Sequence, residues 1–253
     1  MQVTFLGTGT SQGVPIIGCD CEVCLSTNKK DKRLRSSVFV KTEDFALVID
    51  SGPDFRYQLL REGIKDIDAV LYTHEHKDHV AGLDDIRPIN YLQNKSIEVY
   101  GSSLVEVALK REFHYIFSDT KYPGAPQINF NLISNQRFDL GPLSILPIEG
   151  LHYKLPVFGF RIKDFCYITD MNFISDEEKK KLKDLSVLVI NGLRREKHIS
   201  HFTLEEALEM IAELNPKAAY ITHISHQLGT YEEVSQELPD HVHLSYDGLK
   251  LDL

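Results

Sequence analysis

The chain has 253 residues, of which 42% are hydrophobic and 26% charged, and its formal net charge is −9. A chain of this length and composition can bury a large core, so we expect one domain over residues 1–253. The acidic balance argues against a broad nucleic-acid surface, which would neutralise phosphates with lysine and arginine. The sequence has neither an apolar run long enough to span a membrane nor a signal-peptide pattern, so we expect a cytoplasmic protein without a membrane partner.

Strand-like and helical segments alternate along the chain, without a linker or an internal repeat. The hydrophobic patterns predict strands at 3–6, 38–41, 45–50, 69–73, 97–100, 143–147, 158–163, 165–169, 185–190 and 218–222. They predict helices at 55–62, 83–91, 104–116, 176–183, 204–214 and 231–236. This order indicates an α/β (α+β) fold with two sheets and helices outside them.

The first predicted strand leads into a glycine-rich turn at Gly7 and Gly9. The turn lacks the lysine followed by serine or threonine of a P-loop, and it is too short for the dinucleotide-binding fingerprint. We therefore expect the glycines to allow a close backbone turn rather than to bind a nucleotide.

Three cysteines follow in a Cys-X-Cys-X-X-Cys loop over residues 19–24, namely Cys19, Cys21 and Cys24. Three thiols leave one over in any disulfide pairing, and a disulfide at this spacing would be strained. Thiolates are typical of structural zinc, which is closed, tetrahedral and four-coordinate, so one more ligand is needed. Our candidate is His226. A reduced loop without metal is the alternative.

The strand at 69–73 ends in a run that contains three histidines and an aspartate, His74, His76, Asp78 and His79. Imidazole nitrogens and carboxylate oxygens are ligands of zinc, manganese and iron(II), and so dense a group is costly to place unless a cation binds it. Catalytic groups commonly lie on a loop that follows a buried strand. The run therefore predicts a dinuclear hydrolytic site, and a solvated histidine-rich loop is the alternative.

Three later predicted strands or apolar stretches also end in a possible ligand. His152 closes the apolar stretch after 143–147, Asp170 follows the strand at 165–169, and His223 follows the strand at 218–222. Each of these signals is weak by itself, because a histidine after a strand is more often a hydrogen-bonded surface residue.

The run at 74–79 resembles the His-X-His-X-Asp-His signature of the metallo-β-lactamase superfamily, and the three later residues appear in the order of that superfamily. The resemblance implies a four-layer αββα sandwich of two mixed β-sheets and two divalent ions, zinc or manganese. It assigns His74, His76 and His152 to the first metal, and Asp78, His79 and His223 to the second. It makes Asp170 the carboxylate that bridges both.

Residues 5–15, the cysteine loop, 33–37 and 73–85 together resemble the phosphoribosyl 1,2-cyclic phosphate phosphodiesterases of bacterial phosphonate breakdown, a family related to ribonuclease Z. That resemblance implies one structural zinc on the three cysteines and His226. It also implies a general acid in a His-X-Thr setting, which here is His201. Asp78 and Asp170 complete the expected catalytic residues.

A helix is predicted to begin directly after His201. Thr203 and Glu206 form a capping box, and apolar residues follow at helical spacing from Leu204. His201 would therefore lie at a loop-to-helix junction. His198 is close enough to compete for the role of the acid, and its motif position favours His201.

Together these features predict a metal-dependent phosphodiesterase that acts on a small, cyclic ribosyl phosphodiester. The alternatives are a ribonuclease Z-like endonuclease that processes tRNA 3′ ends, and a zinc-stabilised binding protein without turnover. The acidic charge and the lack of a long basic insertion argue against the endonuclease, so nucleic acid is not the expected partner. Residues 114–135 are expected to form a lid or a homodimer contact.

Overall fold

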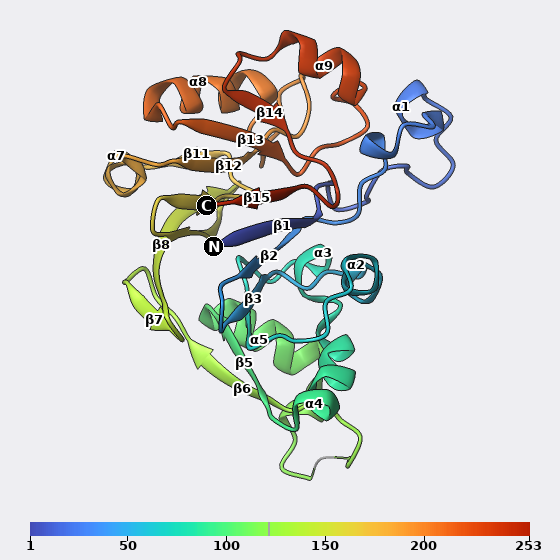
Figure 1. Cartoon of the computed structure of the whole chain (residues 1–253), viewed down its shortest axis with the longest axis vertical. Helices are drawn as coiled ribbons and strands as arrows, with labels where there is room; N and C mark the ends of the chain where they lie inside the picture. Colours follow the sequence, from blue (N-terminus) through green and yellow to red (C-terminus); the bar gives the residue numbers. More distant parts are fainter. Residues whose placement is uncertain (121) are drawn as a thin grey trace. The chain divides into compact units, whose positions relative to one another are not determined.

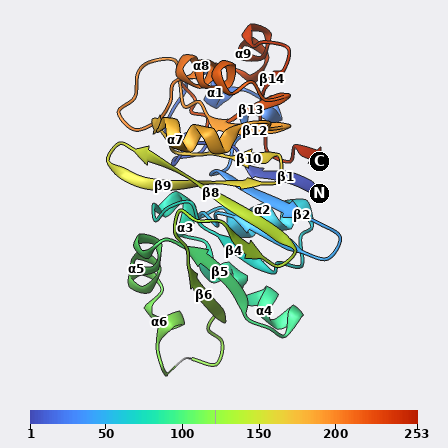
Figure 2. The same ribbon diagram turned by 90° about the vertical axis from the view of Figure 1, so that its left-hand side faces the viewer.

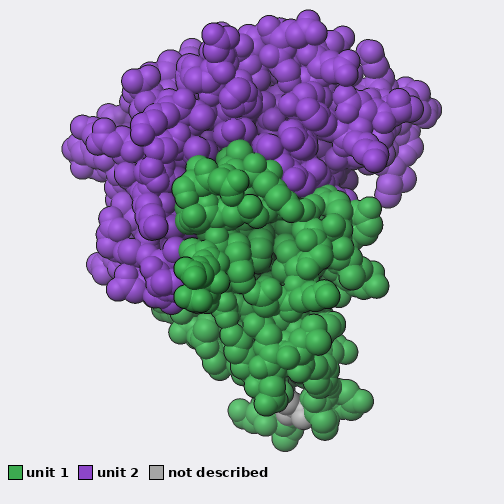
Figure 3. All heavy atoms as spheres, in the orientation of Figure 1, with its two compact units in different colours: residues 1–6, 37–134, 250–253 green, residues 7–36, 135–249 purple. Residues whose placement is uncertain are grey.

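A computed structural model describes residues 1–120 and 122–253 of the chain (Figure 1). The chain divides into two compact units, which Figure 3 colours separately. Unit 1 comprises residues 1–6, 37–134 and 250–253, and unit 2 comprises residues 7–36 and 135–249. Within the described residues each unit contains one β-sheet, and the expectation of a single domain over 1–253 stays a prediction.

The sheet of unit 1 has the strand order β15-β1-β2-β3-β4-β5-β6. Its strands are β1 (Gln2–Gly7), β2 (Ser37–Lys41), β3 (Ala46–Ile49), β4 (Ala69–Leu71), β5 (Ile97–Gly101), β6 (Ile128–Leu132) and β15 (Lys250–Asp252). The pairs from β3 to β6 are parallel, whereas β1 with β15 and β2 with β3 are antiparallel. Parallel neighbours end at the same edge of the sheet, so β3 and β4 carry their following residues to one place.

The helices of unit 1 are α2 (Phe55–Glu62), α3 (Lys77–Val80), α4 (Arg87–Gln93), α5 (Ser103–Glu112) and α6 (His114–Phe117), with a 3₁₀ turn at Leu83–Ile86. Phe55 of α2 and Leu109 of α5 pack in one core cluster with Val48 and Val70 of the sheet. The predicted helix at 83–91 is split, because Pro88 lies in the first turn of α4 and favours a new helix start.

The sheet of unit 2 has the order β11-β8-β9-β10-β12-β13-β14, and β7 pairs with β8. Its strands are β7 (Phe138–Leu140), β8 (Leu143–His152), β9 (Leu155–Ile162), β10 (Phe165–Tyr167), β11 (Phe173–Ile174), β12 (Val187–Asn191), β13 (Ala218–Thr222) and β14 (Val242–Leu244). Figure 2 shows the long antiparallel hairpin of β8 and β9. The pairs from β10 through β12 and β13 to β14 are parallel, so this sheet is mixed as well.

The helices of unit 2 are α1 (Glu22–Leu25), α7 (Asp176–Lys179), α8 (Leu204–Leu214) and α9 (Tyr231–Glu237), with 3₁₀ turns at Lys29–Asp31 and Lys180–Leu182. Figure 1 shows α8 and α9 over one face of the sheet, and Ala207 and Val234 from these helices share a core cluster with Leu188 and Ile221 of the strands. Over the described residues, no helix is long and apolar enough to cross a membrane.

The predicted fold class, an α/β protein with two mixed sheets, is confirmed. Helices α2 and α8 and strand β13 have the predicted bounds. Strands β6, β7, β11 and β15 were not predicted, since they are short and β6 is an edge strand with two asparagines, which are rare in strands. Of the segment 114–135, residue 121 lies outside the described residues, and the suggestion of a lid or dimer contact stays a prediction.

Gly82, just after α3, allows the ligand-bearing loop to pack closely on the residues after β3. Its N–H donates to the Ser51 carbonyl at 2.8 Å, and a Cβ atom here would lie 2.2 Å from the Gly52 oxygen and 2.7 Å from the Phe55 Cβ. We expect Gly82→Ala to lower the free energy of unfolding by about 1–3 kcal/mol through overpacking, as measured by urea denaturation.

Gly63→Ala is the matched control, because Gly63 has a φ of 66° but no atom within 4 Å of the position that a Cβ would take. It should cost about 1 kcal/mol from backbone strain alone. If Gly82→Ala destabilises the protein no more than Gly63→Ala, close packing at Gly82 is not needed.

Candidate metal centres

Four predicted ligands lie together in unit 1, on the loop and short helix that follow β4. His74 and His76 precede α3, with His76 at its N-cap, and Asp78 and His79 belong to the helix. The ring centroid of His74 lies 4.6 Å from that of His76 and 4.2 Å from that of His79. His79 Nε2 lies 3.2 Å from an Asp78 carboxylate oxygen. The motif thus brings its four side chains into one group.

Asp50, a fully buried residue directly after β3, anchors this group. Its Oδ1 accepts a hydrogen bond from the Thr73 backbone N–H at 2.9 Å. Its Oδ2 accepts from the Thr73 hydroxyl at 2.8 Å and from His79 Nδ1–H at 2.7 Å. Burial raises the pKa of Asp50, and the interactions with His79 and Thr73 oppose that shift.

These bonds decide which nitrogen of each histidine a metal can use. His79 gives its Nδ1 proton to Asp50, so Nε2 holds the lone pair of the neutral ring. Thr73 has one hydroxyl proton and donates it to Asp50, so its oxygen accepts Nδ1–H from His74 at 3.0 Å. His74 therefore also presents an Nε2 lone pair, which is the form of imidazole that binds divalent metals.

In unit 2, three predicted ligands lie at or beyond strand ends of one sheet. His152 is the last residue of β8, Asp170 lies three residues beyond β10, and His223 directly follows β13. One Asp170 carboxylate oxygen lies 3.1 Å from His223 Nδ1, and the other lies 3.1 Å from His201 Nε2. Ligand atoms of His152, Asp170 and His201 all lie within 4.8 Å of one another. Unit 2 therefore forms a second group of donors.

Protein oxygens orient the histidines of unit 2 in the same way. His152 donates Nδ1–H to the Ser200 carbonyl at 2.9 Å. Ser36 donates its only hydroxyl proton to the Gly9 carbonyl at 3.0 Å, so the Ser36 oxygen accepts Nδ1–H from His223 at 3.1 Å. Both rings present an Nε2 lone pair, as His74 and His79 do in unit 1.

His201 lies at the junction between a loop and a helix, as the sequence predicts. Thr203 is the N-cap of α8, and Thr203 and Glu206 form the predicted capping box. His201 Nε2 faces Asp170, whereas His198 contacts His201 itself, with 3.0 Å between the two Nδ1 atoms. Of these two histidines, His201 is the one for which the structure gives a contact with the predicted bridging carboxylate.

The four predicted ligands of the structural metal converge in unit 2. The Sγ atoms of Cys19, Cys21 and Cys24 lie 3.3, 3.3 and 3.6 Å from His226 Nδ1. Tetrahedral zinc with typical Zn–S and Zn–N bonds separates these atoms by roughly 3.6 Å, so the four residues fit a closed zinc site. A hydrogen bond from the Cys24 backbone, followed by one from His226, lowers the pKa of Cys21 to about 6, whereas burial raises the pKa of Cys24 to about 11.

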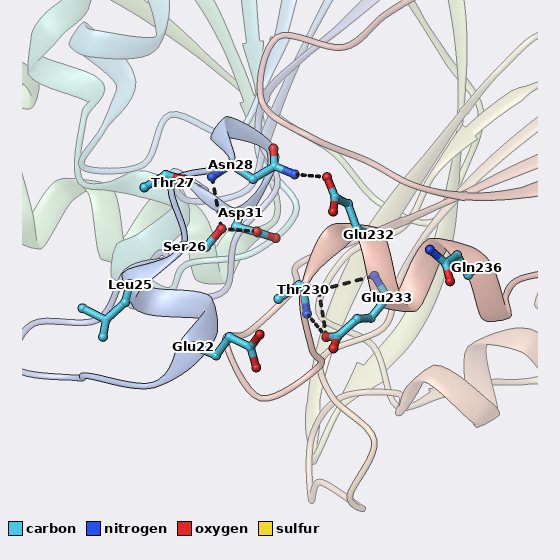
Figure 4. Close-up of a pocket in the computed structure, with 10 residues that line it drawn as sticks. All are labelled: Glu22, Leu25, Ser26, Thr27, Asn28, Asp31, Thr230, Glu232, Glu233 and Gln236. Atoms are coloured by element: carbon cyan, nitrogen blue, oxygen red, sulfur yellow. Dashed lines mark hydrogen bonds between the residues drawn. The ribbon is translucent and has the colours of Figure 1, made fainter.

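A groove of about 690 Å³ lies between the cysteine loop and the start of α9 (Figure 4). Asn28 donates to Glu232 at 3.3 Å, and the Tyr231 N–H donates to Asp31 at 2.7 Å. These hydrogen bonds connect the segment that follows the cysteine loop to α9. The lining includes the carboxyl groups of Glu22, Asp31, Glu232 and Glu233 and none of the predicted metal ligands. Because carboxylates repel phosphate, the groove does not suit an anionic substrate.

Sequence reasoning missed the residues that orient the ligands, namely Asp50, Thr73, Ser36 and Ser200. Asp50 carried a usable signal, because it ends the predicted strand at 45–50 just as Asp170 follows the strand at 165–169. Ser36 belongs to the segment 33–37 that resembles the phosphodiesterase family, but nothing in the sequence indicates its role. That role depends on Gly9 and on His223, which is 187 residues away in the chain.

Comparisons with known proteins identify the family of the chain. The family model described as the Beta-lactamase superfamily domain matches residues 46–224, which is well over half of the chain. A crystal structure of a new diphosphatase from the PhnP family has a TM-score of 0.93 and 39% sequence identity, and the match covers 99% of this chain and 96% of that one. The chain therefore belongs to the β-lactamase superfamily and, within it, to the PhnP family. This confirms the resemblance seen in the sequence motifs.

Two curated relatives match over part of their own length. An octanoyltransferase of Porphyromonas gingivalis (strain ATCC BAA-308 / W83) is 40% identical over 253 residues, which are 99% of this chain and 51% of that protein. A ribonuclease Z of Nanoarchaeum equitans (strain Kin4-M) is 26% identical over 168 residues, which are 62% of this chain and 52% of that protein. The chain thus spans about half the length of these relatives.

Asp50→Asn should weaken metal binding, because an amide offers one acceptor oxygen where the carboxylate offers two for three donors. We expect the affinity for zinc to fall by roughly 10–100-fold, as measured by competition with a chromophoric chelator. Asp66→Asn in the same unit is the matched control, since the ion pair that the described residues give for this exposed side chain is with Lys41. Equal affinities in the two variants would contradict the anchoring role of Asp50.

Cys21→Ser should remove the structural metal, since it replaces one of three thiolates in a four-ligand site. We expect elemental analysis to find about one zinc atom fewer per chain than in the wild type. Cys166→Ala is the control, because Cys166 is buried in β10 and lies outside the four-residue cluster. An unchanged zinc content in Cys21→Ser would rule out this site.

Proposed function

We propose that the protein is a metal-dependent hydrolase that cleaves phosphodiester bonds. The observation that carries the proposal is the common orientation of His74, His79, His152 and His223, each anchored through Nδ1 so that Nε2 holds the lone pair. Histidines that bind metals are usually anchored in this way, because the second hydrogen bond fixes the tautomer and the ring orientation. Membership of the β-lactamase superfamily supports the same conclusion.

The residues fit two divalent ions, zinc or manganese, and one structural zinc on the cysteine loop. By resemblance to the superfamily, the active-site ligands are His74, His76, Asp78, His79, His152, Asp170 and His223. When bound, two such ions stabilise charge on an attacked phosphoryl group and lower the pKa of a water molecule to about 7. Mixed nitrogen and oxygen donors suit both metals.

His201 is the proposed general acid. Its Nε2 lies 3.1 Å from Asp170, and only 8% of the residue is exposed, so the ring is oriented and shielded from water. In the proposed reaction it donates the Nε2 proton to the departing oxygen, which is worth roughly 10²–10⁴-fold in rate. Asp170 accepts a hydrogen bond from the same Nε2–H group and so orients the His201 ring.

A small cyclic ribosyl phosphodiester is the first candidate substrate, from the family resemblance. A diphosphate is the second, because the 39% identical structure is described as a diphosphatase. Both reactions attack a phosphoryl group and differ in the leaving group. Endonuclease action on precursor tRNA ranks lower, since a net charge of −9 does not favour a polyanion. The Porphyromonas gingivalis relative is named an octanoyltransferase, but about half of that protein lies outside the match. We therefore do not extend octanoyl transfer to this chain.

Metal-loaded protein should hydrolyse bis(p-nitrophenyl) phosphate, and His76→Ala should lower kcat/KM by roughly 10²-fold through loss of a ligand. His114→Ala is the control, because His114 is an exposed histidine of α6 in the same unit. A His76→Ala variant as active as the wild type would refute the proposal.

The same preparation should then be compared on 2′,3′-cyclic AMP, pyrophosphate, a precursor tRNA and an octanoyl thioester. Faster turnover of the cyclic phosphodiester supports the first candidate. Faster turnover of pyrophosphate favours the second, and efficient trimming of the tRNA would reverse the ranking against nucleic acid. Metal binding with no turnover of any substrate would favour the non-catalytic binding protein.

A further inference from the structure

The proposed reaction uses His201 and the metal ligands, and it gives no role to the contact between His198 and His201. The Nδ1 atoms of the two rings lie 3.0 Å apart. The Ser200 hydroxyl lies 3.1 Å from His201 Nδ1 and 3.3 Å from His198 Nδ1. Two imidazoles and a hydroxyl therefore meet around the nitrogen of His201 that points away from Asp170.

The proton positions follow from these distances. The Ser200 backbone N–H donates to His198 Nδ1 at 3.4 Å, so this nitrogen holds a lone pair. Two lone pairs 3.0 Å apart would repel each other, so the proton between the two Nδ1 atoms belongs to His201. His201 Nε2 lies 3.1 Å from an Asp170 carboxylate oxygen, which accepts hydrogen bonds, so this nitrogen carries a proton too. The His198 ring thus meets the one His201 nitrogen that is not turned toward Asp170.

The surrounding loop holds His198 in place. Arg194 donates to the carbonyl oxygens of Glu196 and Lys197, both at 3.2 Å, and to Gln227 Oε1 at 2.8 Å. Burial, with the neighbouring His201 and Arg194, lowers the pKa of His198. At neutral pH the ring is therefore uncharged, and its Nδ1 can accept the proton of His201 Nδ1.

We propose that His198 is a positioning residue for the general acid. Its Nδ1 accepts the Nδ1–H of His201 and thereby holds the His201 ring with its Nε2–H directed at Asp170. This inference rests on the proposed function, in which His201 Nε2 protonates the leaving oxygen. In that step His201 starts with a proton on each ring nitrogen. The Nε2–H bond breaks, an O–H bond forms on the leaving group, and a neutral His201 ring remains, whose Nδ1–H is still donated to His198.

The role predicts a dependence on the leaving group. The ribose oxygen released from 2′,3′-cyclic AMP is a strong base and needs a proton, whereas p-nitrophenolate is a stable anion and leaves without one. We expect His198→Ala to lower kcat on 2′,3′-cyclic AMP by about tenfold or more, with little change in KM. The decrease in kcat of the same variant on bis(p-nitrophenyl) phosphate should be several times smaller.

Three further variants separate positioning from mere folding. His198→Asn places an amide oxygen, a hydrogen-bond acceptor, near the former Nδ1 atom and should recover most of the lost activity. Ile199→Ala changes an exposed side chain of the same loop and should leave the ratio between the substrates as in the wild type. If Ser200→Ala, and not His198→Ala, gives the leaving-group effect, the hydroxyl holds the proton and the inference is wrong. It is equally wrong if His198→Ala slows both substrates by the same factor.

A spectroscopic readout distinguishes this inference from the proposed function. Imidazole ¹⁵N NMR of the zinc-loaded wild type should show a hydrogen-bonded proton on His201 Nδ1, and His198→Ala should lose that signal. If the wild type cleaves neither substrate but the Nδ1 signal changes as expected, the proposed function fails and the positioning role stands. An unchanged His201 spectrum in His198→Ala overturns the positioning role, whatever the activity.

Discussion

Four histidines of the proposed active site depend on one kind of interaction, the hydrogen bond from a histidine Nδ1–H to a fixed oxygen. His79 donates to Asp50, His74 to Thr73, His152 to the Ser200 carbonyl and His223 to Ser36. A neutral imidazole without such an acceptor interconverts between two tautomers and turns about its bonds, so its lone pair has no fixed direction. Each hydrogen bond removes that freedom during folding, and a metal then meets ligands that are already oriented.

Left-handed backbone at strand ends brings several of these groups into position. Asp50, Asp170 and His223 have φ values of 63°, 58° and 55°, and the first and last directly follow β3 and β13. Such a conformation costs a residue other than glycine roughly 1–3 kcal/mol, and it persists only where the surroundings enforce it. At Asp50 three hydrogen bonds to a fully buried carboxylate supply that constraint. The left-handed conformation turns the backbone sharply after the strand, and so directs the side chain toward its partners.

Local patterns in the sequence predicted the elements and the ligands better than they predicted the supporting residues. The apolar run of β13 and the capping box of α8 are encoded within a few residues, so both elements have the predicted bounds. The anchors are defined by long-range pairing instead. In the sequence Thr73 resembles an ordinary strand residue, and its role becomes visible only through its hydrogen bond to Asp50. The role of Ser36 likewise becomes visible only through its contacts with Gly9 and His223. Edge strands such as β6 escaped prediction because tertiary pairing, not residue preference, makes them strands.

Formal charge distinguishes the proposed structural zinc site from the proposed active site for an anionic substrate. Zinc bound to three thiolates and a neutral histidine carries a net negative charge, and the neighbouring groove adds four carboxyl groups. The carboxyl groups of this groove repel phosphate. In the proposed active site the ligands are mostly neutral histidines, with Asp78 and Asp170 as the carboxylates, so two divalent ions keep an excess of positive charge. Local charge of that sign can attract a small phosphodiester although the chain carries −9 overall.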